Sequence, residues 1–204
     1  MKIDLIYPKI PENSDKFHGK CIAFEKYDGT NLHWKWNLQE GWHLFGTRRT
    51  QFTFNAKGIN GFRFDHIGLS HAPDIFNETL RDKLTMFLCK HGVFSTCDVT
   101  LFTEFHGPNS FAGDHEISDE HTLTIIDVMM NNKLLDPELC NQYFSKFGSA
   151  RMIFQGKYSG QFAEDVRKGK YDVNEGVVCK GLVDGETFMT KIKTNDYLKR
   201  LRQR

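Results

Sequence analysis

The sequence has no long apolar run and no strong excess of charge of either sign. No stretch approaches the roughly 18 apolar residues of a membrane-spanning helix, and the N-terminus carries acidic residues early, unlike a signal peptide. The formal net charge is only +1, so a nucleic-acid partner would have to be held by a local patch. These absences argue against a membrane partner and favour a cytoplasmic protein.

Cysteine is also sparse, with five residues, an odd number, and no pair at C-x-x-C spacing. A disulfide framework or a thiolate zinc site is therefore not expected, and a reducing compartment fits best. The chain has 204 residues, of which 39% are hydrophobic and 26% charged. That length and composition are typical of a globular protein with one large domain or two small ones.

Short apolar and alternating segments predict a chain rich in strands. We expect helices where apolar residues recur at helical spacing, over residues 73–91, 137–147 and 161–168. The strands are expected over residues 20–25, 31–37, 42–46, 99–105, 122–130, 175–179 and 186–192. Because strands dominate and helices are inserted between them, we predict an α+β fold of mainly antiparallel sheets with flanking helices.

The segment Glu25-Lys26-Tyr27-Asp28-Gly29-Thr30-Asn31 places a lysine where an apolar strand meets a tight turn. Such a position can partly desolvate an amine and make it available as a nucleophile. Gly29 allows a sharp turn and a close approach to a ligand, and Asp28 and Asn31 add polar groups beside the lysine. Alone, the segment is better explained as a surface hairpin with a solvated lysine.

Charged residues at the ends of other strands make a catalytic role for this lysine segment more plausible than a surface hairpin. Each is, alone, best explained as a strand-edge charge that faces solvent. Together they supply carboxylates that can hold a metal or a ribose and cations that can hold phosphates, which is the set that phosphoryl transfer requires. The residues are Arg48, Arg49, Glu104, Glu175, Lys191 and Lys193, and the two lysines project from one face of their strand.

In this order the segments resemble the covalent nucleotidyltransferase superfamily of DNA ligases, RNA ligases and capping enzymes. Gly29-Thr30-Asn31 is similar to the RNA ligase 2 branch, and the stretch 104–113 resembles bacterial and phage RNA-ligase domains. The resembling motifs are Lys26-Tyr27-Asp28-Gly29, Thr47-Arg48-Arg49, Phe102-Thr103-Glu104, Ile125-Ile126-Asp127-Val128, Glu175-Gly176-Val177-Val178 and Lys191-Ile192-Lys193.

The resemblance implies the ligase adenylation fold and an ATP-dependent RNA ligase. Lys26 would attack the α-phosphate of ATP and carry AMP, which then passes to an RNA 5′-phosphate before the 3′-hydroxyl is sealed to it. Glu175 would bind Mg²⁺ or Mn²⁺, which assists by neutralising phosphate charge. Asn31 would serve the later steps at the RNA ends.

The other implied roles concern the nucleotide. Glu25 would contact the adenine edge, and Lys191 and Lys193 would grip the α-phosphate and offset charge on the leaving pyrophosphate. Arg48 or Arg49, between which the motif does not choose, would join Glu104 in holding the ribose or the phosphates.

Two features depart from the branch. Ile126 stands where an aromatic residue often stacks on adenine. Only eleven residues follow Lys193, so we expect one nucleotidyltransferase domain over residues 1–204, without an OB or other C-terminal module. RNA would then be held by patches such as the basic tail, residues 191–204, or with help from a partner subunit. A solvated terminal helix explains that tail equally well.

Several alternatives and weaker signals remain. The enzymatic alternatives are a small DNA ligase and a capping-type guanylyltransferase, and the non-enzymatic one is a nucleotide- or RNA-end-binding domain. His106 and His115 flank the glutamate-motif loop, where we expect surface roles. The aromatic residues Phe52, Phe54, Phe62 and Phe64 are expected to pack in the core.

Overall fold

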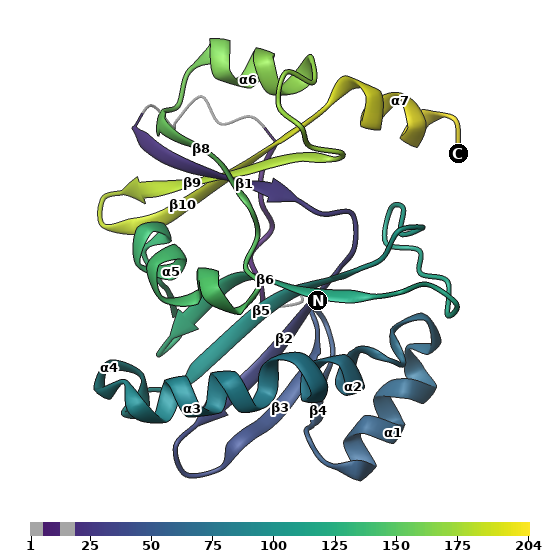
Figure 1. Ribbon diagram of the computed structural model, residues 1–204, viewed down its shortest axis with the longest axis vertical. Coiled ribbons are helices and arrows are strands. Elements are labelled where there is room, and N and C mark those ends of the chain that lie inside the picture. Colours follow the sequence, from purple (N-terminus) through teal and green to yellow (C-terminus); the bar gives the residue numbers. More distant parts are fainter. Residues whose placement is uncertain (1–5, 13–18) are drawn as a thin grey trace, which may run out of the picture. The chain divides into compact units, whose positions relative to one another are not determined.

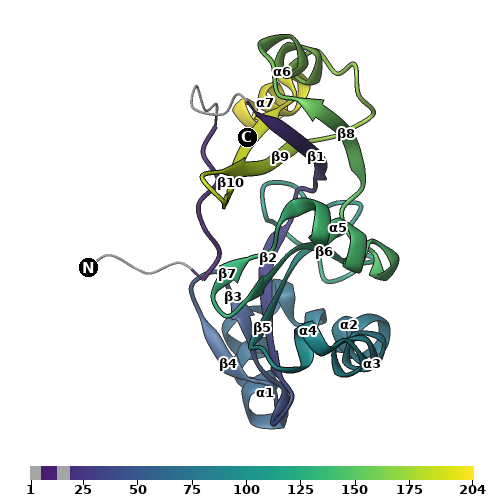
Figure 2. The ribbon, with the colours of Figure 1, turned by 90° about the vertical axis from the view of Figure 1, so that its left-hand side faces the viewer.

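The computed structural model describes residues 6–12 and 19–204, which divide into two compact units (Figures 1 and 2). The described part of unit 1 comprises residues 6–8, 29–135 and 144–149. That of unit 2 comprises residues 9–12, 19–28, 136–143 and 150–204. Among the described residues, no helix is long and apolar enough to cross a membrane. The expectation of a single nucleotidyltransferase domain stays a prediction.

Unit 1 is built on a six-stranded antiparallel sheet. Its strand order is β4-β3-β2-β5-β6-β7, so neighbours in the chain are mostly neighbours in the sheet. The strands are β2 (Thr30–Asn37), β3 (Gly41–Thr47), β4 (Gln51–Thr53), β5 (Val99–His106), β6 (Thr122–Met130) and β7 (Lys133–Leu134). The predicted hairpin between β2 and β3 is confirmed, with Gly41 at φ +67° after the turn.

Helices cover one face of this sheet, and Figures 1 and 2 show α2 and α3 running along it. The ring of Trp34 stacks on Phe76 with centroids 4.0 Å apart and on Phe45 at 5.5 Å. The helices are α1 (Ala56–Asp65), η1 (Ile67–Leu69), α2 (Ala72–Phe76), η2 (Asn77–Arg81), α3 (Asp82–Lys90), α4 (Gly92–Ser95) and η3 (Ser145–Phe147). The predicted helix over residues 73–91 is thus present, with one π-helical segment, η2, within it.

The aromatic residues after β3 only partly form the core that we expected. Phe62 is fully buried, and Phe52 and Phe54 pack against Phe45, half-buried. Phe64 is 83% exposed, so its predicted core position is wrong. Phe62 and Phe64 are two residues apart on helix α1, where such neighbours point in different directions.

Unit 2 is built on a four-stranded antiparallel sheet in the order β10-β9-β1-β8. Its strands are β1 (Lys20–Lys26), β8 (Met152–Lys157), β9 (Gly176–Val183) and β10 (Glu186–Lys193). Its helices are α5 (Pro137–Phe144), whose last residue belongs to unit 1, α6 (Gly160–Arg167) and α7 (Asn195–Arg202). The whole chain is therefore α+β with antiparallel sheets and flanking helices, as predicted.

One face of the unit 2 sheet packs on α6, and this packing decides where the lysines point. Alternate strand residues, among them Ala23, Val177 and Ile192, form an apolar core with Phe162 and Val166 of α6. Because successive residues of a strand point to opposite faces, the residues between them project from the other face. Lys26, Lys191 and Lys193 are among these.

Candidate active site

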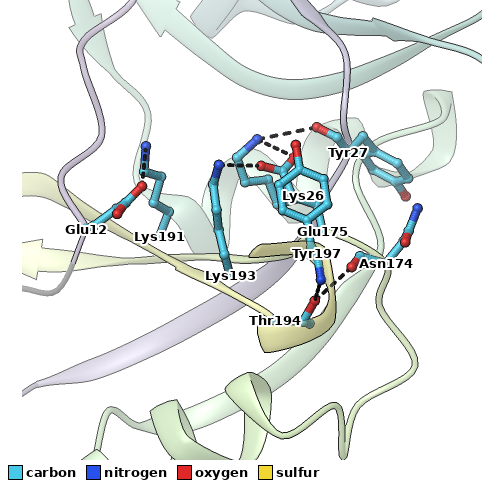
Figure 3. A network of polar contacts seen from close by, with 9 residues as sticks. All are labelled: Glu12, Lys26, Tyr27, Asn174, Glu175, Lys191, Lys193, Thr194 and Tyr197. Carbon is cyan, nitrogen blue, oxygen red and sulfur yellow. Dashed lines mark hydrogen bonds and ion pairs between the residues drawn. The ribbon is translucent and has the colours of Figure 1, made fainter. Parts of the chain in front are cut away.

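Two lysine side chains of unit 2 meet at one buried carboxylate (Figure 3). The Nζ of Lys26 lies 2.7 Å from Oε2 of Glu175, and the Nζ of Lys193 lies 3.3 Å from Oε1. The Glu175 side chain is only 3% exposed, whereas those of Lys26 and Lys193 are 22% and 17% exposed. A buried carboxylate is stabilised by such partners, while the two amines stay accessible to a ligand.

Strand register places these side chains together. Lys26 pairs with Gly176, and Gly176 pairs with Lys193, so the two lysines stand in one row across three strands. Gly176 has φ +149°, and a Cβ there would overlap the carbonyl oxygen of Ile192. Only glycine suits this position, which explains why Glu175 is followed by glycine.

Lys191 stands on the same face but has a different partner. Its Nζ lies 3.3 Å from Oε1 of Glu12, and its backbone N–H donates to the carbonyl of Pro11 at 3.0 Å. The segment around Pro11 thus lies along the open edge of β10. The structure brings Lys193 to Glu175 and leaves Lys191 at the neighbouring position.

Helix α7 supports the nucleophile motif through Tyr197. The Tyr197 side chain is buried, its hydroxyl is hydrogen-bonded to Asp28, and the Lys193 amine lies 5.0 Å from the centre of its ring. Burial, followed by the charges of Glu175 and Asp28, raises the pKa of Tyr197 well above its ordinary value. The hydroxyl therefore stays protonated and donates to Asp28.

The start of α7 is also tied to Glu175. Thr194 caps the helix by accepting from the Tyr197 N–H at 3.2 Å, and its own N–H donates to the Glu175 carbonyl at 2.9 Å (Figure 3). Its hydroxyl donates to the carbonyl of Asn174 at 3.0 Å, and Arg200 donates to the Asn174 side chain. The basic helix is therefore part of the framework of the site.

Glu25 projects from the sheet face opposite to Lys26, because the two are successive strand residues. Its carboxylate accepts from Nε of Arg151 at 3.0 Å, and this hydrogen bond and ion pair raise the pKa of Arg151. The neighbouring Tyr27 has a raised pKa because it is partly buried. The predicted contact of Glu25 with adenine stays a prediction, and the structure adds Arg151 as a partner.

Unit 1 gathers a second set of predicted residues on its sheet face opposite the helices. Tyr7 packs on Phe102 with centroids 4.8 Å apart and donates a hydrogen bond to Asp127. The Arg48 guanidinium lies over the Tyr7 ring, 5.7 Å from its centre. Burial, Asp127 and Glu104 raise the pKa of Tyr7 well above its ordinary value, and Arg48 opposes them.

The two arginines of the basic motif differ in this unit. Arg48 is half-buried, and its Nε is buried without a hydrogen-bond partner among the described residues. Arg49 is exposed. Arg48 and Glu104 both lie close enough to Tyr7 to affect its ionisation, and which of the two arginines binds a ligand stays a prediction. Ile126, at the position of the expected stacking residue, is half-buried in β6.

Asn31 and Gly29 also belong to unit 1. Asn31 is directly opposite Glu104 in the β2–β5 pairing, so both side chains share one face. The Asn31 Nδ2 is buried and has no hydrogen-bond partner among the residues that the structure describes. A Cβ on Gly29 would overlap the carbonyl oxygen of Phe105, so this position requires glycine for packing against β5, and the close approach to a ligand stays a prediction.

The Glu175 carboxylate is suited to a metal ion that is bound jointly by the protein and by the phosphates of a nucleotide. Within the described ranges, no group of three or more His, Cys, Asp or Glu residues could hold a metal by itself. Mg²⁺ in nucleotide enzymes is commonly bound by one or two carboxylates together with substrate phosphates and water. Glu175 could supply one such carboxylate if its lysine partners turned to the phosphates.

Several solved structures of RNA ligases are similar to this chain in fold. An archaeal ATP-dependent RNA ligase is 17% identical with a TM-score of 0.63, and the match covers 95% of this chain and 49% of that one. A Naegleria gruberi RNA ligase with PPi is 15% identical with a TM-score of 0.61, covering 92% and 53%. A variant of the Naegleria ligase with ATP and Mn is 15% identical with a TM-score of 0.61, covering 97% and 60%.

The chain has the fold of these RNA ligases. It spans about half of the length of the solved chains that it matches, from 49% to 60% in these three. Comparison of the sequence with protein-family models and with curated proteins gave no match. The similarity to the RNA ligases is therefore one of backbone fold. The roles of individual residues have to be argued from the contacts and charges described above.

Several residues that surround this chemistry were not predicted. Tyr7, Glu12, Arg151 and Tyr197 all contact predicted site residues, yet none lies in a recognisable motif. Their contacts join residues that are far apart in the chain, as between Tyr7 and Asp127. Only Tyr197 had a usable signal, because Thr194 precedes a basic amphipathic segment as a helix cap.

Proposed function

We propose that this protein is an ATP-dependent RNA ligase that carries AMP on Lys26. The observation that carries the proposal is the pairing of the Lys26 amine with the buried Glu175 carboxylate at 2.7 Å, with Lys193 on the second carboxylate oxygen. A nucleophile, a proton acceptor and a cation are thus held together on a sheet of the RNA ligase fold. The printed names of the solved ligases, with ATP, PPi and Mn, support the same class of reaction.

The first step follows from this geometry. The Lys26 nitrogen attacks the α-phosphorus of ATP, an N–P bond forms, and the bond from that phosphorus to the pyrophosphate oxygen breaks. Glu175 lies within the distance at which a carboxylate can accept the amine proton. Lys191 and Lys193 offset the charge of the departing pyrophosphate. A divalent metal bound by Glu175 and the phosphates would neutralise phosphate charge.

Residues of unit 1 serve both the nucleotide and the later steps. Arg48 and Glu104 hold the ribose or the phosphates of the nucleotide, and the amide of Asn31, whose Nδ2 has no hydrogen-bond partner among the described residues, binds at the RNA ends. AMP passes from Lys26 to the RNA 5′-phosphate, and the RNA 3′-hydroxyl then displaces AMP to form the phosphodiester. RNA is the favoured substrate because Gly29-Thr30-Asn31 resembles the RNA ligase 2 branch.

Intact-mass measurement after incubation with ATP and Mg²⁺ tests the proposal. We expect a gain of one AMP that Lys26→Ala abolishes and Lys26→Arg does not restore, because a guanidinium stays protonated and is not an amine nucleophile. Lys20→Ala, at the exposed start of the same strand, is the matched control and should retain the adduct. Labelling by GTP in place of ATP, or sealing of nicked DNA but not RNA, would contradict the assignment.

A further inference from the structure

The loop between β5 and β6 is bonded to the segment that follows the nucleophile motif. The Nε2 of His115 lies 2.7 Å from the hydroxyl oxygen of Thr30, and its Nδ1 lies 3.0 Å from that of Ser110. The Ser110 hydroxyl in turn accepts from the N–H of Gly107 at 2.7 Å. A continuous chain of hydrogen bonds therefore runs from the end of β5 through His115 to the first residue of β2.

A neutral imidazole satisfies this chain. The Gly107 N–H donates to the Ser110 hydroxyl. One nitrogen of a neutral imidazole donates and the other accepts, so the Ser110 and Thr30 hydroxyls can pair with His115 in either tautomer. The ring also packs against Phe105 with centroids 5.1 Å apart. His115 is half-buried and contacts Thr30, Ser110 and Phe105, so the loop holds its ring in place.

The same loop lies close to the glycine of the nucleophile motif. A Cβ on Gly113 would lie 3.8 Å from both the Gly29 carbonyl oxygen and the Thr30 hydroxyl oxygen. Gly29 is closed in from the other direction by the Phe105 carbonyl and the Glu104 side chain. The backbone from Gly29 to Thr30 is therefore enclosed by β5 and by the loop.

We propose that His115 is a positioning residue that fixes Thr30 and, through it, the unpaired amide of Asn31 for the RNA-joining steps. Asn31 follows Thr30 directly and is paired with Glu104 across the sheet, and its buried Nδ2 has no hydrogen-bond partner among the described residues. Loss of the bond to Thr30 would let the start of β2 move, and displacement of a ligand-binding group by about 1 Å can lower a rate by about 100-fold. This inference rests on the proposed ligase function, because it assigns Asn31 to the RNA ends.

Paired variants of His115 and Thr30 test this positioning role. His115→Phe keeps a ring against Phe105 and removes both hydrogen bonds, and Thr30→Val removes the hydroxyl at nearly constant volume. We expect each to lower sealing of a pre-adenylylated RNA nick by about 10- to 100-fold, while AMP attachment to Lys26 stays within about threefold of the parent. The double variant should be no worse than the worse single one, since both remove the same bond.

Conservative variants and a matched control separate positioning from general damage. His115→Gln can still reach the Thr30 hydroxyl, and Thr30→Ser retains that hydroxyl, so both should restore most of the sealing. His43→Phe, which also removes a histidine hydrogen bond in the same sheet, should leave sealing unchanged. Parental sealing by His115→Phe, or additive losses in the double variant, would overturn the inference.

Amide hydrogen exchange tests the positioning role of His115 without a measurement of ligase activity. In His115→Phe, exchange at Thr30 and Asn31 should become about tenfold faster, whereas β9 should exchange as in the parent. Unchanged exchange at Thr30 and Asn31 would refute the positioning role even if the parent showed no ligase activity. Failure of the parent to form the AMP adduct would instead refute the proposed function.

Discussion

The amines of Lys26 and Lys193 are bound by the two oxygens of a single carboxylate, that of Glu175. The arrangement keeps two positive charges close together on one sheet face, where they would otherwise repel each other. Replacing the carboxylate therefore removes both a proton acceptor and the group that orients the two amines.

Glu175→Gln keeps the shape of the side chain and removes its charge. We expect AMP attachment to Lys26 to slow by about 100-fold or more, because an oriented charge at a phosphoryl-transfer site commonly contributes that much. Single-turnover labelling with ATP measures the effect, and circular dichroism checks the fold. Glu186→Gln, at the exposed start of β10, is the control. Labelling of Glu175→Gln at the parental rate would show that the carboxylate is structural.

Arg48 and Arg49 should differ in their effect on ATP use. Arg48 is half-buried over the Tyr7 ring, whereas Arg49 is exposed. We expect Arg48→Ala to lower kcat/KM for self-adenylylation by about 10- to 100-fold, and Arg49→Ala to change it by less than about threefold. Measurement of the labelling rate across ATP concentrations distinguishes them. A larger loss in Arg49→Ala would reverse the assignment.

His33 should make the folded protein sensitive to acid. Burial, followed by the nearby charge of Lys35, lowers the pKa of His33 from 6.5 to about 4. The folded state therefore favours neutral His33, so the stabilisation is complete above pH 6.5 and is lost as the pH falls through the window from 6.5 to 4. The full loss amounts to about 3 kcal/mol.

Urea unfolding of the parent and of His33→Asn at pH 7.5 and pH 4.5 measures this effect. Asparagine can keep the donor to the Thr47 carbonyl, which His33 Nδ1 contacts at 3.0 Å, but it does not titrate. The parent should lose more stability between the two pH values than the variant does. Equal losses would mean that other groups account for the acid sensitivity.

The exposed cations of α7 and of the residues after it should contribute to RNA binding without affecting AMP attachment. Because α7 begins at the Thr194 cap beside Glu175, removal of the tail would disturb the active site as well. Substitution is the better test: Lys199, Arg202 and Arg204 become glutamine, while Arg200 stays bonded to Asn174. The salt dependence of RNA binding should fall by about 0.7 to 0.9 in log–log slope for each lost contact. An unchanged slope would place the RNA elsewhere.

The sequence predicted strands better than it predicted the surroundings of the site. All seven expected strands are present, because short apolar runs or local alternation mark them in the sequence. Helix α1 was missed although Asn55 caps it, since Gly58 and Gly61 lower its helical propensity. Strand β8 was missed because its sequence does not alternate clearly, and its pairing with β1 is long-range.

In the candidate site, too, the sequence predicted some residues and missed others. Motif order predicted Lys26, Glu175 and Lys193, which the structure brings together. Motifs could not show that Glu12 pairs with Lys191 or that Tyr197 holds Asp28, because these partners depend on where the backbone returns to the sheet. The motif likewise could not show that Arg48 is half-buried beside Tyr7 whereas Arg49 is exposed.

The turn at Asp184 and Gly185 gives the reaction an unexpected dependence on loop length. These two residues have φ +53° and +77° and close the hairpin of β9 and β10, whose register sets Lys193 against Gly176. One inserted residue that shifted this register would turn Lys193 toward α6 and bring Ile192 to the reactive face. The length of an exposed turn at the far end of the hairpin thus determines which face Lys193 projects from.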